Sequence, residues 1–273
     1  MRMTLAICPR SMAMALLMAC ALAVPAKAEI SCTLVIDAVS REAVHETGDC
    51  DRRVPPASTF KVPLAVMGFD AGFLIDSATP TLPFVEGYAD WIAAWRRDTG
   101  PARWMEHSVV WYSQAIASAL GAERLTAYAS AFDYGNADFS GDPGRNNGLE
   151  RSWISSSLLV SPREQAAFLA KLLDRSLPVS ASAIEKTLMI VQSHAAGDGW
   201  TLWGKTGSAY PRRADGNFDR GRGWGWYAGW AARGERLLVV VRLHQADGPG
   251  APTGGAHVRD RLIAGWPSLA ASF

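Results

Sequence analysis

The sequence predicts an α/β (α+β) fold, in which helices flank a central antiparallel sheet built from both ends of the chain. Strand-like segments occur near the N-terminus, a helical region follows, and strands return before a terminal helix. This order predicts a sheet shared by the two chain ends, with a helical subdomain inserted between them. The apolar faces of the sheet and of the helices can then be buried against each other. Apolar residues make up 49% of the 273 residues, which is enough for one large core.

The predicted strands are apolar runs bounded by turn residues. Residues 33–36 (TLVI) have the pattern of a buried strand, and residues 42–47 are its expected hairpin partner. Three further strands and a terminal helix are expected over residues 200–205, 224–232, 237–244 and 257–269. Strand pairs at both chain ends indicate one shared sheet.

The inserted helical part is expected over about residues 73–195, within a domain that spans residues 29–273. Residues 108–120 and 122–132 carry apolar side chains at helical spacing. Ser161-Pro162-Arg163-Glu164 is a capping box with proline at the first helical position, so it predicts the start of another helix.

Residues 1–28 follow the pattern of a secretory signal peptide. Two arginines precede an apolar run at residues 12–24, and Ala26-Lys27-Ala28 places small residues around a cleavable bond. Cleavage before Glu29 is expected to release the chain into the periplasm. An uncleaved anchor is the weaker alternative because the apolar run is short. Lipid attachment at Cys20 stays open as a second alternative.

Two cysteines, Cys32 and Cys50, follow the signal peptide and flank the predicted hairpin. In an exported chain such a pair predicts a disulfide, and two free buried thiols are the alternative. Closing a loop of this size stabilises a fold by roughly 3 kcal/mol in the chain-entropy model.

Charge and histidine spacing restrict the possible partners. The 27 basic and 26 acidic residues nearly cancel, so neither nucleic acid nor another polyanion is an expected partner. After residue 30 no apolar run is long enough to span a bilayer, so no membrane partner is expected once the signal is cleaved. The five histidines lack zinc-binding spacing, so no metal is expected. A small-molecule substrate is therefore the expected partner. The sequence leaves the oligomeric state open between monomer and homodimer.

The first motif that carries chemistry is Ser58-Thr59-Phe60-Lys61, an S-x-x-K. On a helix entered at Ser58, positions three apart share a face, so the Lys61 amine can approach the hydroxyl and take its proton. The apolar residues that follow Lys61 favour a neutral amine. The motif alone is weak, since Ser58 could be only a helix cap and Lys61 a solvated side chain.

The second motif is Lys205-Thr206-Gly207, expected at the end of an edge strand. It offers a cation, a hydroxyl and a closely approaching backbone to a ligand that bears a carboxylate, and an N–H for an oxyanion hole. Only five of the 27 basic residues are lysines, which makes the two motif lysines notable. A simple strand-to-turn transition is the plain alternative.

The order of the motifs is more specific than either motif alone. S-x-x-K followed by Lys-Thr-Gly is typical of penicillin-binding proteins and β-lactamases. Ser108-Val109-Val110, Tyr134-Gly135-Asn136 and Trp153 lie between them in this sequence. Together these motifs resemble those of class D (OXA-type) serine β-lactamases across essentially the whole chain after the signal. The absence of S-D-N at Ser108 argues against class A.

The resemblance implies the serine β-lactamase/penicillin-binding fold and a role for each catalytic residue. Ser58 would be the acylated nucleophile. Lys61, carboxylated by CO₂, would be the general base for acylation and deacylation, and no other cofactor is implied. Val110 would form an apolar wall beside Lys61, Trp153 would donate its indole N–H to the carboxylated lysine, and Ser108 would relay a proton to the lactam nitrogen.

The resemblance also implies an oxyanion hole from the backbone N–H groups of Ser58 and Ser208. The residues that would bind the substrate are Lys205, Thr206, Gly207, Ser208 and Arg259. Arg261 stays open as an alternative to Arg259. Ser108 could instead be a helix cap, and Val110 and Trp153 core residues. A penicillin sensor that stays acylated, a D,D-peptidase and an unrelated esterase remain alternative functions.

Overall fold

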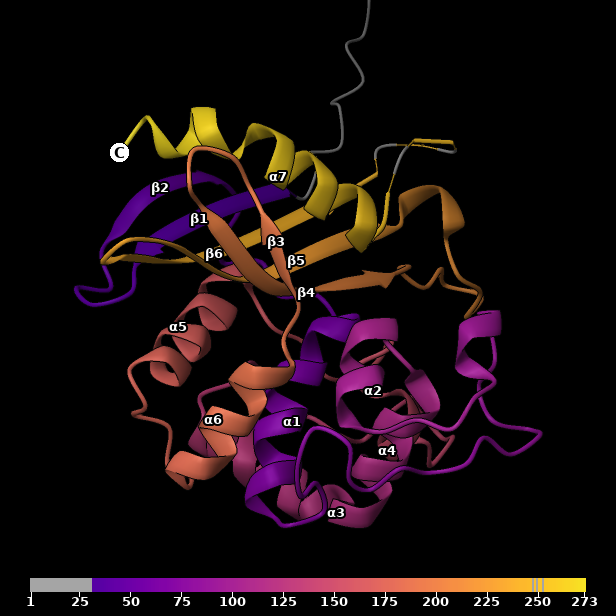
Figure 1. Cartoon of the computed structure of the whole chain (residues 1–273). Coiled ribbons are helices and arrows are strands. Elements are labelled where there is room, and N and C mark those ends of the chain that lie inside the picture. The colour runs from indigo at the N-terminus through magenta and orange to yellow at the C-terminus, as the bar shows by residue number, and fades with distance from the viewer. Residues whose placement is uncertain (1–30, 247, 249, 252) are drawn as a thin grey trace, which may run out of the picture.

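The computed structural model of the chain describes residues 31–246, 248, 250–251 and 253–273 (Figure 1). The predicted signal peptide, its cleavage site and Cys20 lie outside the described residues. A six-stranded antiparallel sheet has the order β2-β1-β6-β5-β4-β3. Its strands are β1 (Ser31–Asp37), β2 (Ala43–Gly48), β3 (Ser193–Ala195), β4 (Thr201–Ala209), β5 (Trp224–Arg233) and β6 (Arg236–Gln245).

Helices cover both faces of this sheet. Helix α7 lies on one face and the remaining helices form a layer on the other (Figure 1). The α-helices of the described chain are α1 (Lys61–Asp70), α2 (Pro101–His107), α3 (Val110–Ala131), α4 (Gly148–Arg151), α5 (Pro162–Leu173), α6 (Ala181–Ile190) and α7 (Gly255–Ala270). The short 3₁₀ helices are η1 (Ala57–Phe60), η2 (Ala93–Trp95) and η3 (Arg220–Arg222). The predicted α/β (α+β) fold, with one sheet built from both chain ends, is confirmed.

The sheet separates two hydrophobic cores. In β6, Val240 packs with Leu262 and Trp266 of α7, whereas its neighbours Val239 and Val241 join the larger core with the other helices. Successive residues of a strand point to opposite faces, so a strand covered on both sides has a continuous apolar run. This explains why the sequence of β6 shows no alternation of polar and apolar residues.

The predicted disulfide between Cys32 and Cys50 is confirmed. Their Cα atoms lie 5.1 Å apart, and both residues are 1% exposed. The bond joins β1 to the segment that follows β2, so it closes the hairpin directly before the S-x-x-K segment. Within the described residues, no helix combines the length and apolar character needed to cross a bilayer.

Helix α5 begins as its sequence predicts. The Ser161 hydroxyl accepts a hydrogen bond from the Glu164 backbone N–H, and the Glu164 carboxylate accepts one from the Ser161 N–H, which completes the capping box. Pro162 occupies the first helical position, where its missing N–H is not needed.

The helix expected over residues 108–120 begins two residues later than predicted. Ser108 is the C-terminal cap of α2, with a left-handed φ of 57°, and Val109 is extended, so α3 starts at Val110. The predicted helix over residues 122–132 is the second half of α3, which bends at Gly121. The correction matters because Ser108 therefore lies in a turn between two helices.

Candidate active site

The S-x-x-K segment crosses from η1 into α1. Ser58 is half-buried in the 3₁₀ turn, and Lys61 is the first residue of the α-helix. Two contacts hold the chain before Ser58: the Ala57 N–H donates to the Trp153 carbonyl at 2.9 Å, and the Trp226 indole N–H donates to the Pro55 carbonyl at 3.0 Å. The position of Ser58 is therefore set by the Trp153 loop and the sheet together.

Lys61 lies in the hydrophobic core at 1% exposure. Within the described part of the chain it forms no ion pair with a carboxylate. Burial, with a smaller contribution from the positive charge of Lys205, holds the pKa of the Lys61 amine well below its ordinary value. A buried amine whose pKa is lowered gives up its proton more readily than an exposed lysine, so Lys61 has the properties of a base.

The Lys61 amine has a buried polar partner that the sequence did not indicate. Its Nζ donates to Ser113 Oγ at 2.7 Å, and the indole N–H of Trp104 donates to the same oxygen at 2.8 Å. Ser113 and Trp104 are both fully buried. The available signal was spacing alone, because Ser113 follows Val110 by three residues and so shares its face of α3.

The S-x-V residues lie at the junction of α2 and α3. Val110 is 4% exposed and belongs to the same core as the residues around Lys61. Ser108 is half-buried, and its hydroxyl has no hydrogen-bond partner among the described residues. A left-handed φ costs a non-glycine residue about 1 kcal/mol or more, and such backbone strain often occurs at functional sites.

Trp153 packs against the S-x-x-K segment. Its ring stacks on Phe60, with centroids 5.5 Å apart and an interplanar angle of 29°. The side chain is 1% exposed, and its indole N–H has no hydrogen-bond partner among the described residues. That donor is therefore available to a group bound beside it.

Tyr134-Gly135-Asn136 supports this region structurally. The Asn136 amide donates to the Ser157 carbonyl at 2.8 Å and its oxygen accepts from the Leu159 N–H at 2.9 Å. Tyr134 contacts Phe60, with ring centroids 6.0 Å apart. These contacts give Tyr134-Gly135-Asn136 a structural role, because the turn holds the segment that follows Trp153.

Lys205-Thr206-Gly207 lies within β4, not at the end of an edge strand as expected. Strand β3 pairs with β4 only at Thr201–Trp203, so among the described strands none pairs with the later half of β4 on that side. The 3₁₀ helix η1 packs against β4. A Cβ added to Gly207 would lie 2.7 Å from the Pro56 carbonyl oxygen and 3.2 Å from the Ser58 nitrogen, so glycine is needed for this approach.

Lys205 and Arg259 share a cavity of about 220 Å³. Lys205 is 5% exposed, and burial, together with the nearby positive charge of Arg259, lowers its pKa to about 8. Thr206 also lines this cavity, with Met105, Glu106, Gln192, Gly204 and His194. Arg261 instead lines a separate cavity with Arg242. Of the two arginines, Arg259 is therefore the one beside Lys205.

Helix α7 brings Arg259 to this cavity through a close contact with β4. The Gly255 N–H donates to Ser208 Oγ at 2.8 Å, and a Cβ on Gly255 would lie 2.6 Å from the Cβ of Thr206. Any larger residue at Gly255 would push the first turn of α7 away from the strand. The small residue therefore sets the distance between Arg259 and Lys205.

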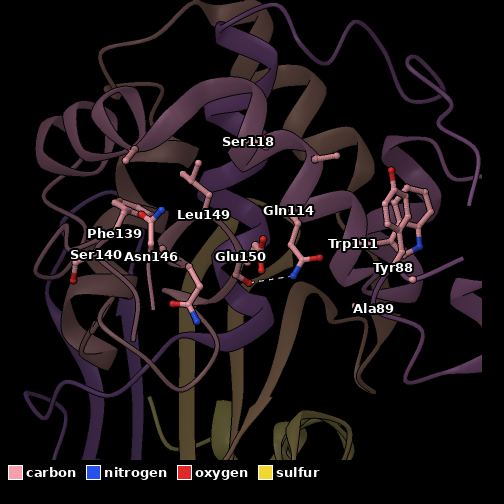
Figure 2. Close-up of a pocket in the computed structure, with 15 residues that line it drawn as sticks. Tyr88, Ala89, Trp111, Gln114, Ser118, Phe139, Ser140, Asn146, Leu149 and Glu150 are labelled. Atoms are coloured by element: carbon pink, nitrogen blue, oxygen red, sulfur yellow. Dashed lines mark hydrogen bonds between the residues drawn. The ribbon is translucent and has the colours of Figure 1, made fainter. Parts of the chain in front are cut away.

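A larger groove, of about 780 Å³, lies elsewhere and contains none of the predicted site residues (Figure 2). Tyr88 and Trp111 stack at one end, with ring centroids 5.3 Å apart. The Gln114 amide donates across it to the Glu150 carbonyl at 3.3 Å (Figure 2). The size of a cavity therefore does not locate the chemistry in this protein.

The charges and hydroxyls around η1 suit acyl transfer. A lysine amine with a lowered pKa, three residues after a serine, can take the proton of that hydroxyl, and the two cations of the Lys205 cavity favour a substrate that carries an anion. The low dielectric around the buried lysines strengthens such interactions relative to water.

Comparisons with known proteins agree with this geometry. The family model described as the penicillin binding protein transpeptidase domain matches residues 34–264. The chain is 39% identical over 241 residues to β-lactamase OXA-9 of Klebsiella pneumoniae, covering 88% of each chain. It is 39% identical over 181 residues to β-lactamase OXA-1 of Escherichia coli, covering 66% of this chain and 64% of that one.

Solved structures give the same result. The crystal structure of OXA-427 class D β-lactamase superposes with a TM-score of 0.81 at 43% identity, covering 89% of this chain and all of the other. With the fold, the motif order and the relatives in agreement, the chain belongs to the class D serine β-lactamases, which are hydrolases.

Proposed function

We propose that this enzyme hydrolyses β-lactam antibiotics through an acyl-enzyme on Ser58, with carboxylated Lys61 as general base for acylation and deacylation. The observation that carries the proposal is the Lys61 amine, which is fully buried, has a strongly lowered pKa and begins the helix that follows Ser58. Relatives named β-lactamase at 39% identity support the substrate class.

Substrate binding begins with the carboxylate that β-lactams carry. Lys205 and Arg259 supply two positive charges in one small cavity, and Thr206 adds a hydroxyl. Charge-assisted hydrogen bonds to a carboxylate are about twice as strong as neutral ones, and burial of Lys205 strengthens them further. The later half of β4, which no described strand pairs with on the β3 side, then presents backbone groups to the rest of the substrate.

The ring opens when Ser58 Oγ attacks the lactam carbonyl and its proton moves to the base at Lys61. The developing oxyanion accepts hydrogen bonds from the N–H groups of Ser58 and Ser208. Ser108 passes a proton to the leaving lactam nitrogen. The same base then removes a proton from water, which attacks the ester carbonyl and frees Ser58.

The residues around Lys61 fit a carboxylated side chain. Carboxylation requires an unprotonated amine, and burial favours that form by lowering the pKa of Lys61. Val110 contributes an apolar wall, and the unpartnered indole N–H of Trp153 is a free donor for an anionic oxygen. When present, the carboxylate would supply the general base for both steps.

We also assign the enzyme to the periplasm. The Cys32–Cys50 disulfide supports this, since disulfides persist in oxidising compartments. The signal-peptide pattern of residues 1–28 supports it independently.

Turnover of a chromogenic cephalosporin by residues 29–273, with and without added bicarbonate, tests the proposal. Many turnovers per enzyme, raised by bicarbonate and lost in Ser58→Ala, are expected. Lys61→Ala should lose turnover even in excess bicarbonate. A burst of one equivalent followed by no further reaction would instead support the sensor or the D,D-peptidase.

A further inference from the structure

Three buried groups meet at the hydroxyl of Ser113. Lys61 Nζ donates to Ser113 Oγ at 2.7 Å, Trp104 donates at 2.8 Å, and the Val109 carbonyl oxygen lies 3.5 Å away. Ser113 and Trp104 are 0% exposed. This polar cluster lies inside an otherwise apolar core, and the roles assigned above use only its lysine, not Ser113 or Trp104.

The hydrogen-bond capacity of each group fixes the direction of these bonds. A serine oxygen has two acceptor sites and one proton, and an indole N–H is only a donor. Trp104 therefore occupies one acceptor site, the proton is left for the Val109 carbonyl, and the second acceptor site faces Lys61. A carboxylated lysine nitrogen can only donate, so its N–H matches this acceptor site.

The position of Ser113 on α3 shows that the hydroxyl is not simply satisfied within its helix. A serine inside a helix commonly donates to the carbonyl four residues earlier, here Val109. At 3.5 Å that contact is long, whereas the contacts to Lys61 and Trp104 are short. The strong bonds of Ser113 are the ones that connect it to another helix and to the lysine.

We propose that Ser113, oriented by Trp104, is a positioning residue that holds the Lys61 nitrogen for carboxylation and then accepts the single N–H of the carboxylated lysine. This inference rests on the proposed function, because it concerns the same base. Trp104 acts through Ser113 and also lies against the amine, with its ring centroid 5.9 Å from Lys61 Nζ.

In the carboxylation step the lone pair of the neutral amine attacks the carbon of CO₂. A C–N bond forms, one C–O π pair moves to oxygen, and one amine proton leaves to water. Dissolved bicarbonate supplies the CO₂. The nitrogen then keeps one N–H, and its lone pair is delocalised, so it can only donate.

An acceptor that fixes this N–H also fixes the carboxylate. With the N–H directed at Ser113, the new carboxylate must point away from Ser113, so it is free to face other groups around the lysine. The same acceptor would also stabilise an ammonium, but burial and the charge of Lys205 oppose that form and hold the Lys61 pKa low. Without Ser113, the N–H would lie unpaired in the core, and an unpaired buried donor is costly.

The test measures carboxylation directly, by ¹³C NMR of the enzyme with [¹³C]bicarbonate and without substrate. The chain after residue 28 has only four lysines, and loss of the signal in Lys61→Ala assigns it. We expect Ser113→Ala to raise the bicarbonate concentration at half-maximal signal about tenfold, which corresponds to the loss of one buried hydrogen bond. Trp104→Phe should shift it in the same direction by about threefold.

Matched controls are available on the same helix. Ser118→Ala removes an exposed hydroxyl from α3. Trp111→Phe removes a buried indole hydrogen bond, to the Trp95 carbonyl, that does not involve Lys61. Both should keep the wild-type bicarbonate dependence. High bicarbonate should restore turnover in Ser113→Ala, because the variant keeps all the groups that react.

The possible results separate the two proposals. If wild-type enzyme gives no Lys61 signal, the proposed base is wrong. If wild type gives the signal and folded Ser113→Ala and Trp104→Phe match its half-maximal bicarbonate concentration, the proposed base stands and the role of Ser113 is wrong. If Ser113→Ala does not fold, the half-maximal bicarbonate concentrations of Trp104→Phe and Trp111→Phe are compared. A higher value in Trp104→Phe supports the role of Ser113, and equal values contradict it.

Discussion

Replacing Trp153 by phenylalanine isolates the contribution of one N–H group in the proposed active site. The phenyl ring can keep the stack on Phe60, and no internal hydrogen bond is lost, because the indole N–H has no partner among the described residues. The loss of ring volume at a site 1% exposed should cost about 1–2 kcal/mol of unfolding free energy.

The effect of Trp153→Phe on turnover should be larger than its effect on stability. The proposed acceptor of the Trp153 N–H is the carboxylate on Lys61, and a hydrogen bond to a charged group contributes about 1.5–3 kcal/mol. Since about 1.4 kcal/mol corresponds to tenfold in rate, deacylation should slow about 10- to 150-fold. Stopped-flow with a chromogenic cephalosporin should show a fast acylation burst followed by a slow steady state.

The matched control is Trp266→Phe. Trp266 is also buried, and its indole N–H has no partner, but it belongs to the core under α7. This variant should lose similar stability and keep wild-type kinetics. Deacylation within twofold of wild type in Trp153→Phe would refute the role given to the indole N–H.

Three further predictions concern charge and the disulfide. Arg259→Ala should raise KM for a β-lactam at least tenfold with little change in kcat, whereas Arg261→Ala should leave KM unchanged; equal effects would contradict the assignment. Since the pKa of Lys205 is about 8 and the substrate carboxylate needs its protonated form, KM should rise as pH increases through 8, and a KM flat to pH 10 would exclude this. Double substitution Cys32→Ala/Cys50→Ala should lower the unfolding free energy by roughly 3 kcal/mol in urea denaturation, with unchanged stability as the contrary result.

Much of the fold could be predicted because its signals are local. The capping box at Ser161 and the apolar runs of β1 and β6 each determine an element within a few residues. The start of α3 was misplaced because Ser108 has a left-handed backbone, which serine seldom adopts and which no neighbouring residue signals.

The sequence indicated candidate site residues where several motifs occur together, but it could not indicate a residue that matters only through one contact partner. Ser113 follows Lys61 by 52 positions, and a lone serine on an apolar helix face carries no sign of a lysine opposite it. Arg259 and Arg261 were open because both fit the sequence context, yet residues two apart on a helix do not share a face. Only the docking of α7 on β4 distinguishes them.

The measurement that tests the central claim most directly is the lifetime of the acyl-enzyme, followed by quenching and intact-protein mass spectrometry. In CO₂-depleted buffer, one equivalent of a penicillin should stay covalently bound, and digestion should map it to the peptide that contains Ser58. Added bicarbonate should remove this adduct within the enzyme's turnover time, and Lys61→Ala should retain any adduct it forms. An adduct on another residue, or a lifetime that bicarbonate does not change, would contradict the claim that carboxylated Lys61 frees Ser58.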